Sequence, residues 1–483
     1  MIITDRPQLF IGGSWQDPRG DDVTEVRNPA TGARLATAAL ACAADMDAAV
    51  RAARASFDAG TWAGTPPNER AAVLHRAADL LDKRSDELAR AITAELGCPI
   101  WFSQGAHVPN PIRHLRYYAD LCRDFGYEQR RGDGTNTSLV VQEPVGVVAA
   151  ITPWNGPLST PALKTAPALA AGCSVVLKPA PETPLTVYAL AEALAEAGLP
   201  EGVLSIVPAG REAGEHLVRH PEVDKVAFTG STAAGKRIMA LCAERIARVT
   251  LELGGKSAAV ILDDADPGRV IPALLPMALM VNGQACIAQT RVLVPRSRQR
   301  EFTDALAAAL RAQTVGDPVV PDTTIGPLVS QRQRDRVEGY LQAGRQEGAR
   351  VVTGGGRPQL PGDLAAGWFV EPTLLDAVDN GMRVAREEIF GPVLAVIAYD
   401  DDDEAAVAIA NDSPYGLSGS VWSGDPERAL AIARRVRTGM VSINGRPQAF
   451  GTPFGGFKQS GVGREMGPEG FRAYLEVKSI AVG

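Results

Sequence analysis

The chain has 483 residues, a length that predicts two to four domains at roughly 100–200 residues per domain. Its formal net charge is −7, which argues against a nucleic-acid partner, because a protein that neutralises many phosphates carries an excess of Lys and Arg. A hydrophobic fraction of 45% with 22% charged residues is typical of a folded globular protein and excludes a disordered chain.

Histidine and cysteine are scarce and dispersed. The five His show no HExxH spacing, which argues against a His-based metal site and against Ser-His-Asp catalysis. The six Cys include no CxxC pair, so neither a zinc site nor a disulfide framework is expected. The sequence therefore predicts no bound metal and reduced thiols, as in a cytoplasmic protein.

No segment has the length or the composition of a membrane anchor. The longest apolar stretch, from Val145 to Thr152, is far short of the ~20 residues that a membrane span needs. The first residues include Asp5 and lack the sustained apolar run of a secretory signal. We expect a cytoplasmic protein without a membrane partner.

The first half of the chain changes from short strands and amphipathic helices to an alternation of strands and helices. Short strand-like pieces occupy residues 1–30, and residues 43–60 and 68–97 repeat apolar side chains at the three- and four-residue spacing of helices. Continuous apolar strands separated by helices then predict a parallel sheet covered on both faces, which binds ligands at the carboxyl ends of its strands. The predicted strands are residues 145–152, 173–178, 203–208, 225–230 and 248–255.

A second alternation follows Gly255 and predicts a second α/β domain of about 190 residues. Two further β-like strips, one in residues 135–144 and one at the end of the chain, have the character of edge strands that extend the sheet of another subunit. The predicted strands of the second domain are residues 256–266, 290–295, 349–355, 368–375 and 392–400.

Two motifs at strand ends suit a phosphate or a ribose. FTGSTAAGK (228–236) places glycines between a strand and a helix, where free N–H groups can face an anion. It differs from a P-loop because Arg237 stands where a Mg²⁺-binding hydroxyl is required. Lys178, in VLKPAPETPLT, ends a strand where a ribose or phosphate can bind. The alternatives are a tight turn without a ligand and an exposed Lys.

Four further motifs offer reactive or binding groups. Asn155 can donate its amide to an oxyanion, and Glu252, within an apolar strand, has the desolvated setting of a general base. Cys286, in NGQACIAQTR, can act as a nucleophile, and Glu388 beside Phe390 can bind sugar hydroxyls. Taken singly, these residues could equally be a turn residue, a structural ion pair, a buried inert thiol and a cap.

The combination of motifs is more specific than any one of them. TPWN, LKPA, FTGSTAAG, ELGGK, NGQACIAQTR, EEIFGP, NDSPYGLSGSVW and PFGGFKQSGVGRE, in this order, resemble the NAD(P)-dependent aldehyde dehydrogenase superfamily over essentially the whole chain. The resemblance implies an α/β fold with two doubly wound parallel-sheet domains, one for the cofactor and one for catalysis, plus a small β oligomerisation flap. The implied boundaries are 1–122 with 145–254 for the dinucleotide-binding domain, 255–455 for the catalytic domain, and 123–144 with 456–483 for the oligomerisation segments.

The resemblance also implies a reaction and the residues that perform it. An aldehyde is oxidised to the carboxylic acid through a thiohemiacetal and a thioester on Cys286, with Glu252 activating the hydrolytic water. Asn155 and the backbone N–H of Cys286 form the oxyanion hole, and Lys164 and Glu465 relay protons. The implied cofactor contacts are Thr152, Pro153, Trp154, Lys178, Gly230, Ser231, Gly235, Leu253, Glu388 and Phe390. A homodimer or homotetramer is expected.

The sequence departs from the family pattern at the cofactor and substrate positions. The family often reads K-P-x-E after this strand, but here Pro181 stands at the Glu position and Glu182 comes one place later. NAD is the first expectation. NADP is the alternative, because the carboxylate that would repel its 2′-phosphate is absent from the usual position. Gly156 and Leu163 replace bulky aromatics, which favours medium-chain, terpenoid or aromatic aldehydes.

Two other functions stay open. A CoA-acylating semialdehyde dehydrogenase is disfavoured because such branches generally lack the carboxylate found here at Glu252. A catalytically silent paralogue is disfavoured by the full set of Cys286, Glu252 and Asn155.

Overall fold

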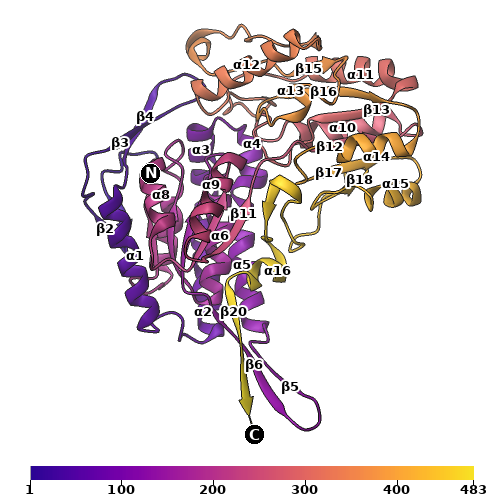
Figure 1. The fold of residues 1–483 in the computed structure, drawn as a ribbon. Helices are drawn as coiled ribbons and strands as arrows, with labels where there is room; N and C mark the ends of the chain where they lie inside the picture. The colour runs from indigo at the N-terminus through magenta and orange to yellow at the C-terminus, as the bar shows by residue number, and fades with distance from the viewer. Residues whose placement is uncertain (1, 483) are drawn as a thin grey trace.

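Two large sheets dominate the computed structural model, which describes residues 2–482 (Figure 1). The first sheet has eight strands in the order β19-β11-β10-β7-β8-β9-β1-β2. Its five central strands run parallel, and β1, β2 and β19 pair antiparallel at the edges. The strands are β1 (Leu9–Ile11), β2 (Ser14–Gln16), β7 (Val147–Ile151), β8 (Ser174–Lys178), β9 (Leu204–Ile206), β10 (Lys225–Thr229), β11 (Arg248–Glu252) and β19 (Gly461–Val462).

Helices cover both faces of the first sheet, because alternate side chains of its strands are apolar on both sides. In β7, Val147 and Ala149 pack into one core and Val148 and Ala150 into the other. One face carries α1 (Ala43–Asp58), α8 (Arg211–Arg219) and α9 (Thr232–Ala243). The other carries α2 (Pro67–Asp82), α3 (Ser85–Leu96), α4 (Ile100–Phe102), the π-helix η1 (Ser103–His107), α5 (Pro109–Asp124), α6 (Ser159–Ala171) and α7 (Tyr188–Glu196).

The second sheet has seven strands in the order β14-β15-β16-β13-β12-β17-β18, parallel except for β14. Its strands are β12 (Ala258–Ile261), β13 (Arg291–Pro295), β14 (Arg350–Thr353), β15 (Thr373–Asp376), β16 (Val393–Tyr399), β17 (Gly419–Trp422) and β18 (Ser442–Ile443). Around it lie α10 (Pro267–Ala278), η2 (Arg296–Arg298), α11 (Gln299–Arg311), α12 (Gln331–Gln346), η3 (Gly362–Ala366), α13 (Arg383–Arg386), α14 (Asp403–Asn411) and α15 (Pro426–Ala433). The two α/β sheets confirm the predicted fold class.

Two smaller sheets complete the fold. In the three-stranded sheet, β6 (Thr137–Pro144) pairs with both β5 (Glu128–Gly132) and β20 (Leu475–Val482), and this sheet projects from the body at the bottom of Figure 1. β3 (Val23–Arg27) pairs with β4 (Arg34–Ala39). The C-terminal part also contains η4 (Lys458–Ser460) and α16 (Gly467–Arg472). Because β19 joins the first sheet, residues 456–483 contribute to two sheets.

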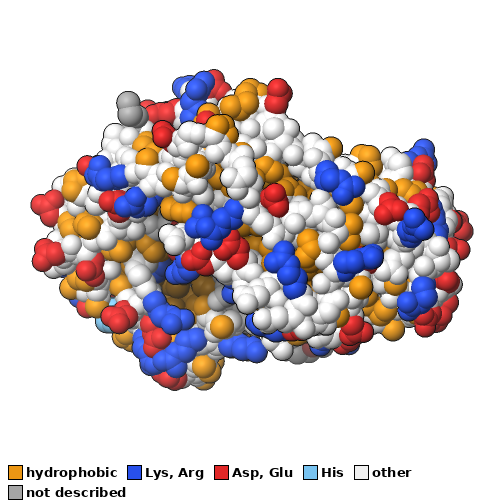
Figure 2. Space-filling model, turned by 90° about the horizontal axis from the view of Figure 1, so that it is seen from above, with side chains coloured by type: hydrophobic (Ala, Val, Ile, Leu, Met, Phe, Trp, Pro, Cys, Tyr) orange, Lys and Arg blue, Asp and Glu red, His pale blue; other side chains and the backbone are white. Residues whose placement is uncertain are grey.

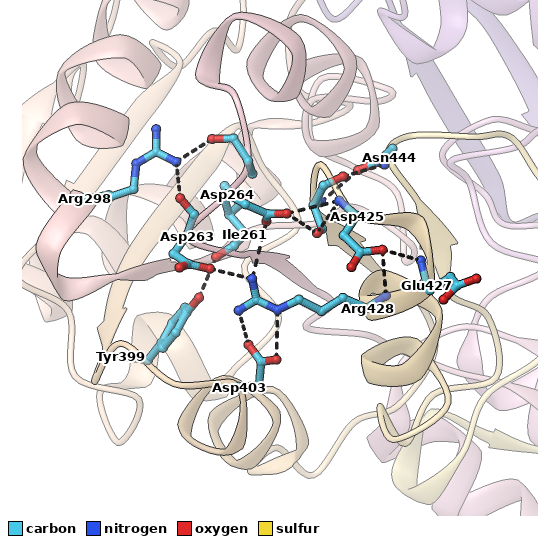
Figure 3. A network of polar contacts seen from close by, with 12 residues as sticks. Ile261, Asp263, Asp264, Arg298, Tyr399, Asp403, Asp425, Glu427, Arg428 and Asn444 are labelled. Carbon is cyan, nitrogen blue, oxygen red and sulfur yellow. Dashed lines mark hydrogen bonds and ion pairs between the residues drawn. The ribbon is translucent and has the colours of Figure 1, made fainter.

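Ion pairs close the carboxyl end of β12 in the second sheet (Figure 3). Arg428 of α15 donates to Asp263, just past β12, at 2.7 Å and to Asp403 at 2.6 and 3.0 Å. The Tyr399 hydroxyl donates to the Ile261 carbonyl at 2.8 Å. Cys286 and Glu388 come just before β13 and β16, so they lie at the opposite end of this parallel sheet.

The outer surface mixes charges of both signs. Figure 2 shows, from above, a hollow with hydrophobic side chains in it and both Lys or Arg and Asp or Glu around it. None of the helices within residues 2–482 combines the length and the apolar run that a membrane crossing requires.

Candidate active site

A cavity of about 450 Å³ lies where the strand order of the first sheet reverses. The reversal falls between β7 and β10, since β7 is followed along the chain by β8 on one side and neighbours β10 on the other. Ligands of doubly wound sheets bind in the crevice at such a switch point. The cavity is lined by Pro153, Trp154, Asn155, Thr229, Gly230, Ser231, Leu253, Gly254, Cys286, Arg332, Gln333, Arg336, Glu388 and Phe390.

Cys286 faces this cavity from a loop that two contacts hold in place. The Asn155 side-chain amide donates to the Gln284 carbonyl at 2.8 Å. A Cβ on Gly255 would lie 2.4 Å from the Cys286 carbonyl oxygen, so only glycine allows the turn after β11 to approach this loop. Burial, followed by the carboxylates of Glu388 and Glu252, raises the pKa of the Cys286 thiol to about 12. The resting thiol is therefore protonated at neutral pH and needs a base.

Glu252 ends β11 and is only 2% exposed. Within residues 2–482, neither of its carboxylate oxygens has a hydrogen-bond partner. Burial, with the Glu465 carboxylate as the second cause, raises the pKa of Glu252 well above its usual value, while Lys164 and Arg464 oppose this shift. A carboxylate without a partner and with a raised pKa is free to accept a proton near neutral pH.

Lys164 and Glu465 form a buried ion pair beside Glu252. The Lys164 Nζ lies 2.5 Å from a Glu465 carboxylate oxygen, and the two side chains are 0% and 3% exposed. Lys164 comes from α6, and Glu465 is held by two backbone hydrogen bonds with Phe454. The fold therefore brings together two residues that lie 301 positions apart.

Glu388 is held against the turn that follows β11. One carboxylate oxygen accepts a hydrogen bond from the Gly255 N–H at 3.0 Å, and a Cβ on Gly254 would lie 2.6 Å from the other. Burial raises the pKa of Glu388 to about 7, against the Gly255 hydrogen bond and the charges of Arg336 and Lys256. The ring of Phe390 meets Trp154 edge-on, with ring centres 5.3 Å apart.

A second cavity, of about 480 Å³, lies between α8, α9 and the end of β8. Lys178 enters it, is 8% exposed, and packs its side chain against Gly214. Burial lowers the pKa of Lys178 to about 8, while Glu182 opposes the shift. Its lining residues are Ile151, Lys178, Gly210, Arg211, Gly214, Glu215, Val218, Phe228, Ala233, Ala234, Arg237, Ile238 and Leu241.

The two cavities fit the two halves of a dinucleotide. They adjoin along β10 and the start of α9, where Ser231 caps the helix by accepting from the Ala234 N–H at 3.3 Å. The N-terminus of α9 and the Lys178 ammonium favour an anion, and a Glu388 oxygen accepts hydrogen bonds as ribose hydroxyls require. Because residue 254 is glycine, no Cβ lies against the Glu388 carboxylate at this point of the cavity wall.

Two predicted cofactor contacts do not line either cavity. Thr152 is buried, and its N–H donates to the Lys178 carbonyl at 3.1 Å. Gly235 lies against Leu253, where a Cβ would come within 2.4 Å of that side chain, so this glycine lets α9 pack closely on the end of β11. The other predicted cofactor contacts line one cavity or the other.

The structure adds three lining residues that the motifs did not reveal. Arg332, Gln333 and Arg336 lie in the first turns of α12. Gln333 donates to the Phe390 carbonyl at 2.7 Å, and Arg336 donates to the Glu388 carbonyl at 2.6 Å, so α12 fixes this wall of the cavity. In the sequence these residues belong to an ordinary polar helix start, which carries no local signal for a ligand.

A cavity at the switch point of a doubly wound sheet, with a thiol at its wall, defines a dinucleotide-dependent oxidoreductase. Residues 15–480 match the aldehyde dehydrogenase family model, and the chain belongs to the aldehyde dehydrogenase family. It is 48% identical to geranial dehydrogenase of Castellaniella defragrans over 480 residues, 99% of each chain. The family predicted from the motifs is thereby confirmed.

Solved structures agree with this assignment. The chain superposes on a Mycobacterium tuberculosis aldehyde dehydrogenase complexed with NAD⁺ with a TM-score of 0.97, 49% identity and 99% coverage of both chains. It superposes on a mutant of aldehyde dehydrogenase C from Pseudomonas syringae, in complex with NAD⁺ and octanal, with a TM-score of 0.94 and 42% identity, covering 98% and 96% of the two chains. The protein is an NAD(P)-dependent aldehyde dehydrogenase, and both of these solved structures hold NAD⁺.

Proposed function

We propose that Cys286 is the nucleophile and Glu252 the base in the oxidation of an apolar aldehyde to its carboxylic acid. The observation that carries this assignment is geometric: Cys286 lines the cavity, and the buried Glu252 carboxylate, whose two oxygens have no hydrogen-bond partner within residues 2–482, ends β11 two positions before Gly254 in the wall of the same cavity. A thiol with a raised pKa beside a carboxylate with a raised pKa forms a nucleophile and base pair.

The first stage forms a bond between Cys286 and the substrate. Glu252 accepts the thiol proton, and the sulfur attacks the aldehyde carbon, so that the carbonyl oxygen becomes an alkoxide. Asn155 has two amide N–H groups, of which one is bonded to Gln284, and the other can donate to this oxygen. Such a donor contributes roughly 10²–10³ in rate. NAD, when bound, supplies the hydride acceptor.

The second stage releases the acid. Loss of a hydride from the alkoxide carbon leaves a thioester on Cys286, and Glu252 passes the thiol proton to solvent so that its carboxylate is free again. Glu252 then accepts a proton from water, the resulting hydroxide attacks the thioester carbon, and the C–S bond breaks to return the Cys286 thiolate. The Lys164 and Glu465 pair beside Glu252 offers a route for this proton, because it is buried and linked by a 2.5 Å contact. Hydrolysis needs this base, which favours free acid as the product over an acyl-CoA.

The substrate is proposed to be a medium-chain, terpenoid or aromatic aldehyde. Gly156 does not itself open extra space, since a Cβ there would lie 2.6 Å from the Thr160 Oγ1 and 2.7 Å from the Ser159 Oγ. Phe450 packs against α5, with its ring 5.1 Å from His114 and 5.6 Å from Tyr117. The names of the relatives, a geranial dehydrogenase and a structure with octanal, support this class.

NAD is proposed as the preferred cofactor over NADP. Pro181 removes the carboxylate from the usual position, but Glu182 still lies close enough to Lys178 to raise its pKa. A carboxylate here would repel a 2′-phosphate by like charge.

The assembly, the domain division and the cellular location are also proposals. The exposed three-stranded sheet supports a homodimer or homotetramer, because an open edge invites pairing with another subunit. The two large sheets support domains at 1–122 with 145–254 and at 255–455. Six free cysteines support a cytoplasmic location.

An aldehyde panel run with NAD and with NADP tests this proposal. Octanal, geranial and benzaldehyde should exceed succinate semialdehyde in kcat/KM by about tenfold, with higher values for NAD than for NADP. Cys286→Ala should abolish NADH formation, whereas Cys242→Ala, at a thiol in α9 outside both cavities, should not.

A preference for succinate semialdehyde or for NADP contradicts the substrate or cofactor proposal. Acyl-CoA in place of free acid supports the CoA-acylating alternative, and cofactor binding without turnover supports a silent paralogue.

A further inference from the structure

An ion pair beside the Cys286 cavity joins the two α/β halves of the molecule. The Arg332 guanidinium, in the first turn of α12, lies 2.8 Å from a Glu182 carboxylate oxygen in the loop between β8 and α7. Glu182 belongs to the first sheet's half of the molecule, whereas α12 packs on the second sheet, at the top of Figure 1. We propose that this pair is a latch that retains the dinucleotide, and that it must open before the cofactor leaves.

The latch joins the α12 wall of the Cys286 cavity to the loop that follows β8. Arg332 lines the 450 Å³ cavity that holds Cys286. Glu182 comes four positions after Lys178, which enters the 480 Å³ cavity, and its charge acts on that ammonium. Thr183, next to Glu182, is bonded to Trp154 in the wall of the Cys286 cavity, so the pair connects two segments between which a dinucleotide in both cavities would be held.

Hydrogen bonds order the backbone beside each member of the ion pair. On the Glu182 side, the Thr183 hydroxyl donates to the Trp154 carbonyl at 3.0 Å, and the buried Glu95 carboxylate accepts from the N–H groups of Leu185 and Thr186, each at 3.1 Å. Pro181 restricts the same loop. Little additional backbone order is therefore needed to form the pair.

On the Arg332 side, the helix start is equally constrained. Ser330 caps α12 by accepting from the Gln333 N–H at 3.2 Å, and the Gln333 side chain is bonded to the Phe390 carbonyl. The pair itself is open to solvent, with side-chain exposures of 82% for Arg332 and 23% for Glu182. Solvent screening limits such a pair to a modest effect, so breaking it should change a rate by about two- to fivefold.

The test measures the release of NADH from the whole enzyme by stopped-flow fluorescence, with excess NAD⁺ as the displacing ligand. Glu182→Gln and Arg332→Gln should each accelerate release by about two- to fivefold, and the double variant should release no faster than the faster single variant. The charge-swapped variant, Glu182→Arg with Arg332→Glu, should return the rate toward that of the wild type.

A matched control lies on the same helix. Glu338 of α12 pairs with Arg357 away from both cavities, and Arg357→Gln should leave NADH release unchanged. Unchanged release in both single variants would overturn the proposal, and so would effects that simply add in the double variant. Acceleration by Arg332→Gln alone would also overturn it, since that result describes a direct contact between Arg332 and the cofactor.

Discussion

At the residue scale, burial raises the pKa of three groups at the site. Cys286, Glu252 and Glu388 all have raised pKa values, and burial is the first cause of each shift. Desolvation of this kind keeps the thiol protonated at rest and prepares the carboxylate to remove that proton. The Lys164 and Glu465 pair sets the balance, because its two members act on Glu252 in opposite directions.

The first prediction uses these opposite effects on the pH dependence of kcat/KM. Glu465→Gln removes a like charge, so the pKa of Glu252 should fall and the acid limb should shift to lower pH by about one unit. Lys164→Met removes an opposite charge, so the pKa of Glu252 should rise and the acid limb should shift to higher pH by a similar amount. The measurement is the kcat/KM profile with octanal between pH 5 and pH 9 at saturating NAD.

Each variant of the pair leaves a buried partner behind, so thermal unfolding must show that both still fold at the assay temperature. Shifts of the same sign in both variants would contradict the assigned roles. Two profiles identical to that of the wild type would show that Glu252 is not the titrating base.

The residues that sequence could identify are those within short local motifs. Glu252 lies in an apolar strand two positions before Gly254, and Cys286 lies in a loop three positions after Gly283. Neither pattern is decisive when taken singly, and the order of the motifs is what identifies both residues. The contacts from α12, such as Gln333 with the Phe390 carbonyl, could not be predicted because they join segments 57 residues apart through side-chain geometry.

At the element scale, the Gly254–Gly255 turn organises the site. It lies between the Glu388 carboxylate and the Cys286 carbonyl, and neither position has room for a Cβ. The turn follows β11, which carries Glu252, so a single strand end positions Glu252, the Cys286 loop and the Glu388 carboxylate.

The second prediction is that Gly255→Ala displaces the Cys286 loop. The added Cβ would meet the Cys286 carbonyl at 2.4 Å, where backbone must move, and a displacement of about 1 Å should lower kcat by about 10²-fold. Steady-state kinetics with octanal provide the measurement. Gly268→Ala, at an exposed helix position where the nearest atom is 3.3 Å away, is the matched control and should keep full activity.

Full activity of Gly255→Ala with an unchanged melting temperature would show that the turn does not position Cys286. A large fall in melting temperature without a fall in kcat would assign the turn a structural role only.

The long elements were predictable because their apolar spacing is strong. The runs at 225–230 and 392–400, for example, correspond to β10 and β16. The two-residue strands β18 and β19 and the π-helix at Ser103–His107 were not predictable, since they depend on partners distant in sequence and have too few residues to show a period.

At the scale of the whole molecule, the three-stranded sheet remains largely uncovered. Val477 and Ile480 of β20 are 67% and 40% exposed and, because they are three positions apart in a strand, they leave apolar side chains exposed on both faces of this sheet. The third prediction is that a second subunit covers this sheet.

Light scattering should give the mass of a dimer or tetramer for the wild type, and Val477→Asp with Ile480→Asp should shift the mass toward that of the monomer. Leu430→Asp, at a 45% exposed side chain of α15, is the control and should leave the assembly unchanged. A wild-type monomer would contradict the proposed assembly.

The whole architecture was accessible from sequence only through the order of its motifs. Strand and helix periodicity predicts two α/β units, but the order of strands within a sheet depends on crossovers that periodicity does not reveal. β19 is an example. This two-residue strand near the end of the chain joins the first sheet by pairing with β11, more than 200 residues earlier, with Leu251 opposite Val462.

The most direct test of the central claim is to trap the acyl group on Cys286. Glu252→Gln, incubated with octanal and NAD, should accumulate a thioester, seen by intact mass spectrometry as one octanoyl group and located by digestion on the peptide that contains Cys286. The adduct should be absent without NAD and absent from the variant that also carries Cys286→Ala. An octanoyl group on another residue, or undiminished acid production by Glu252→Gln with no adduct, would contradict the account.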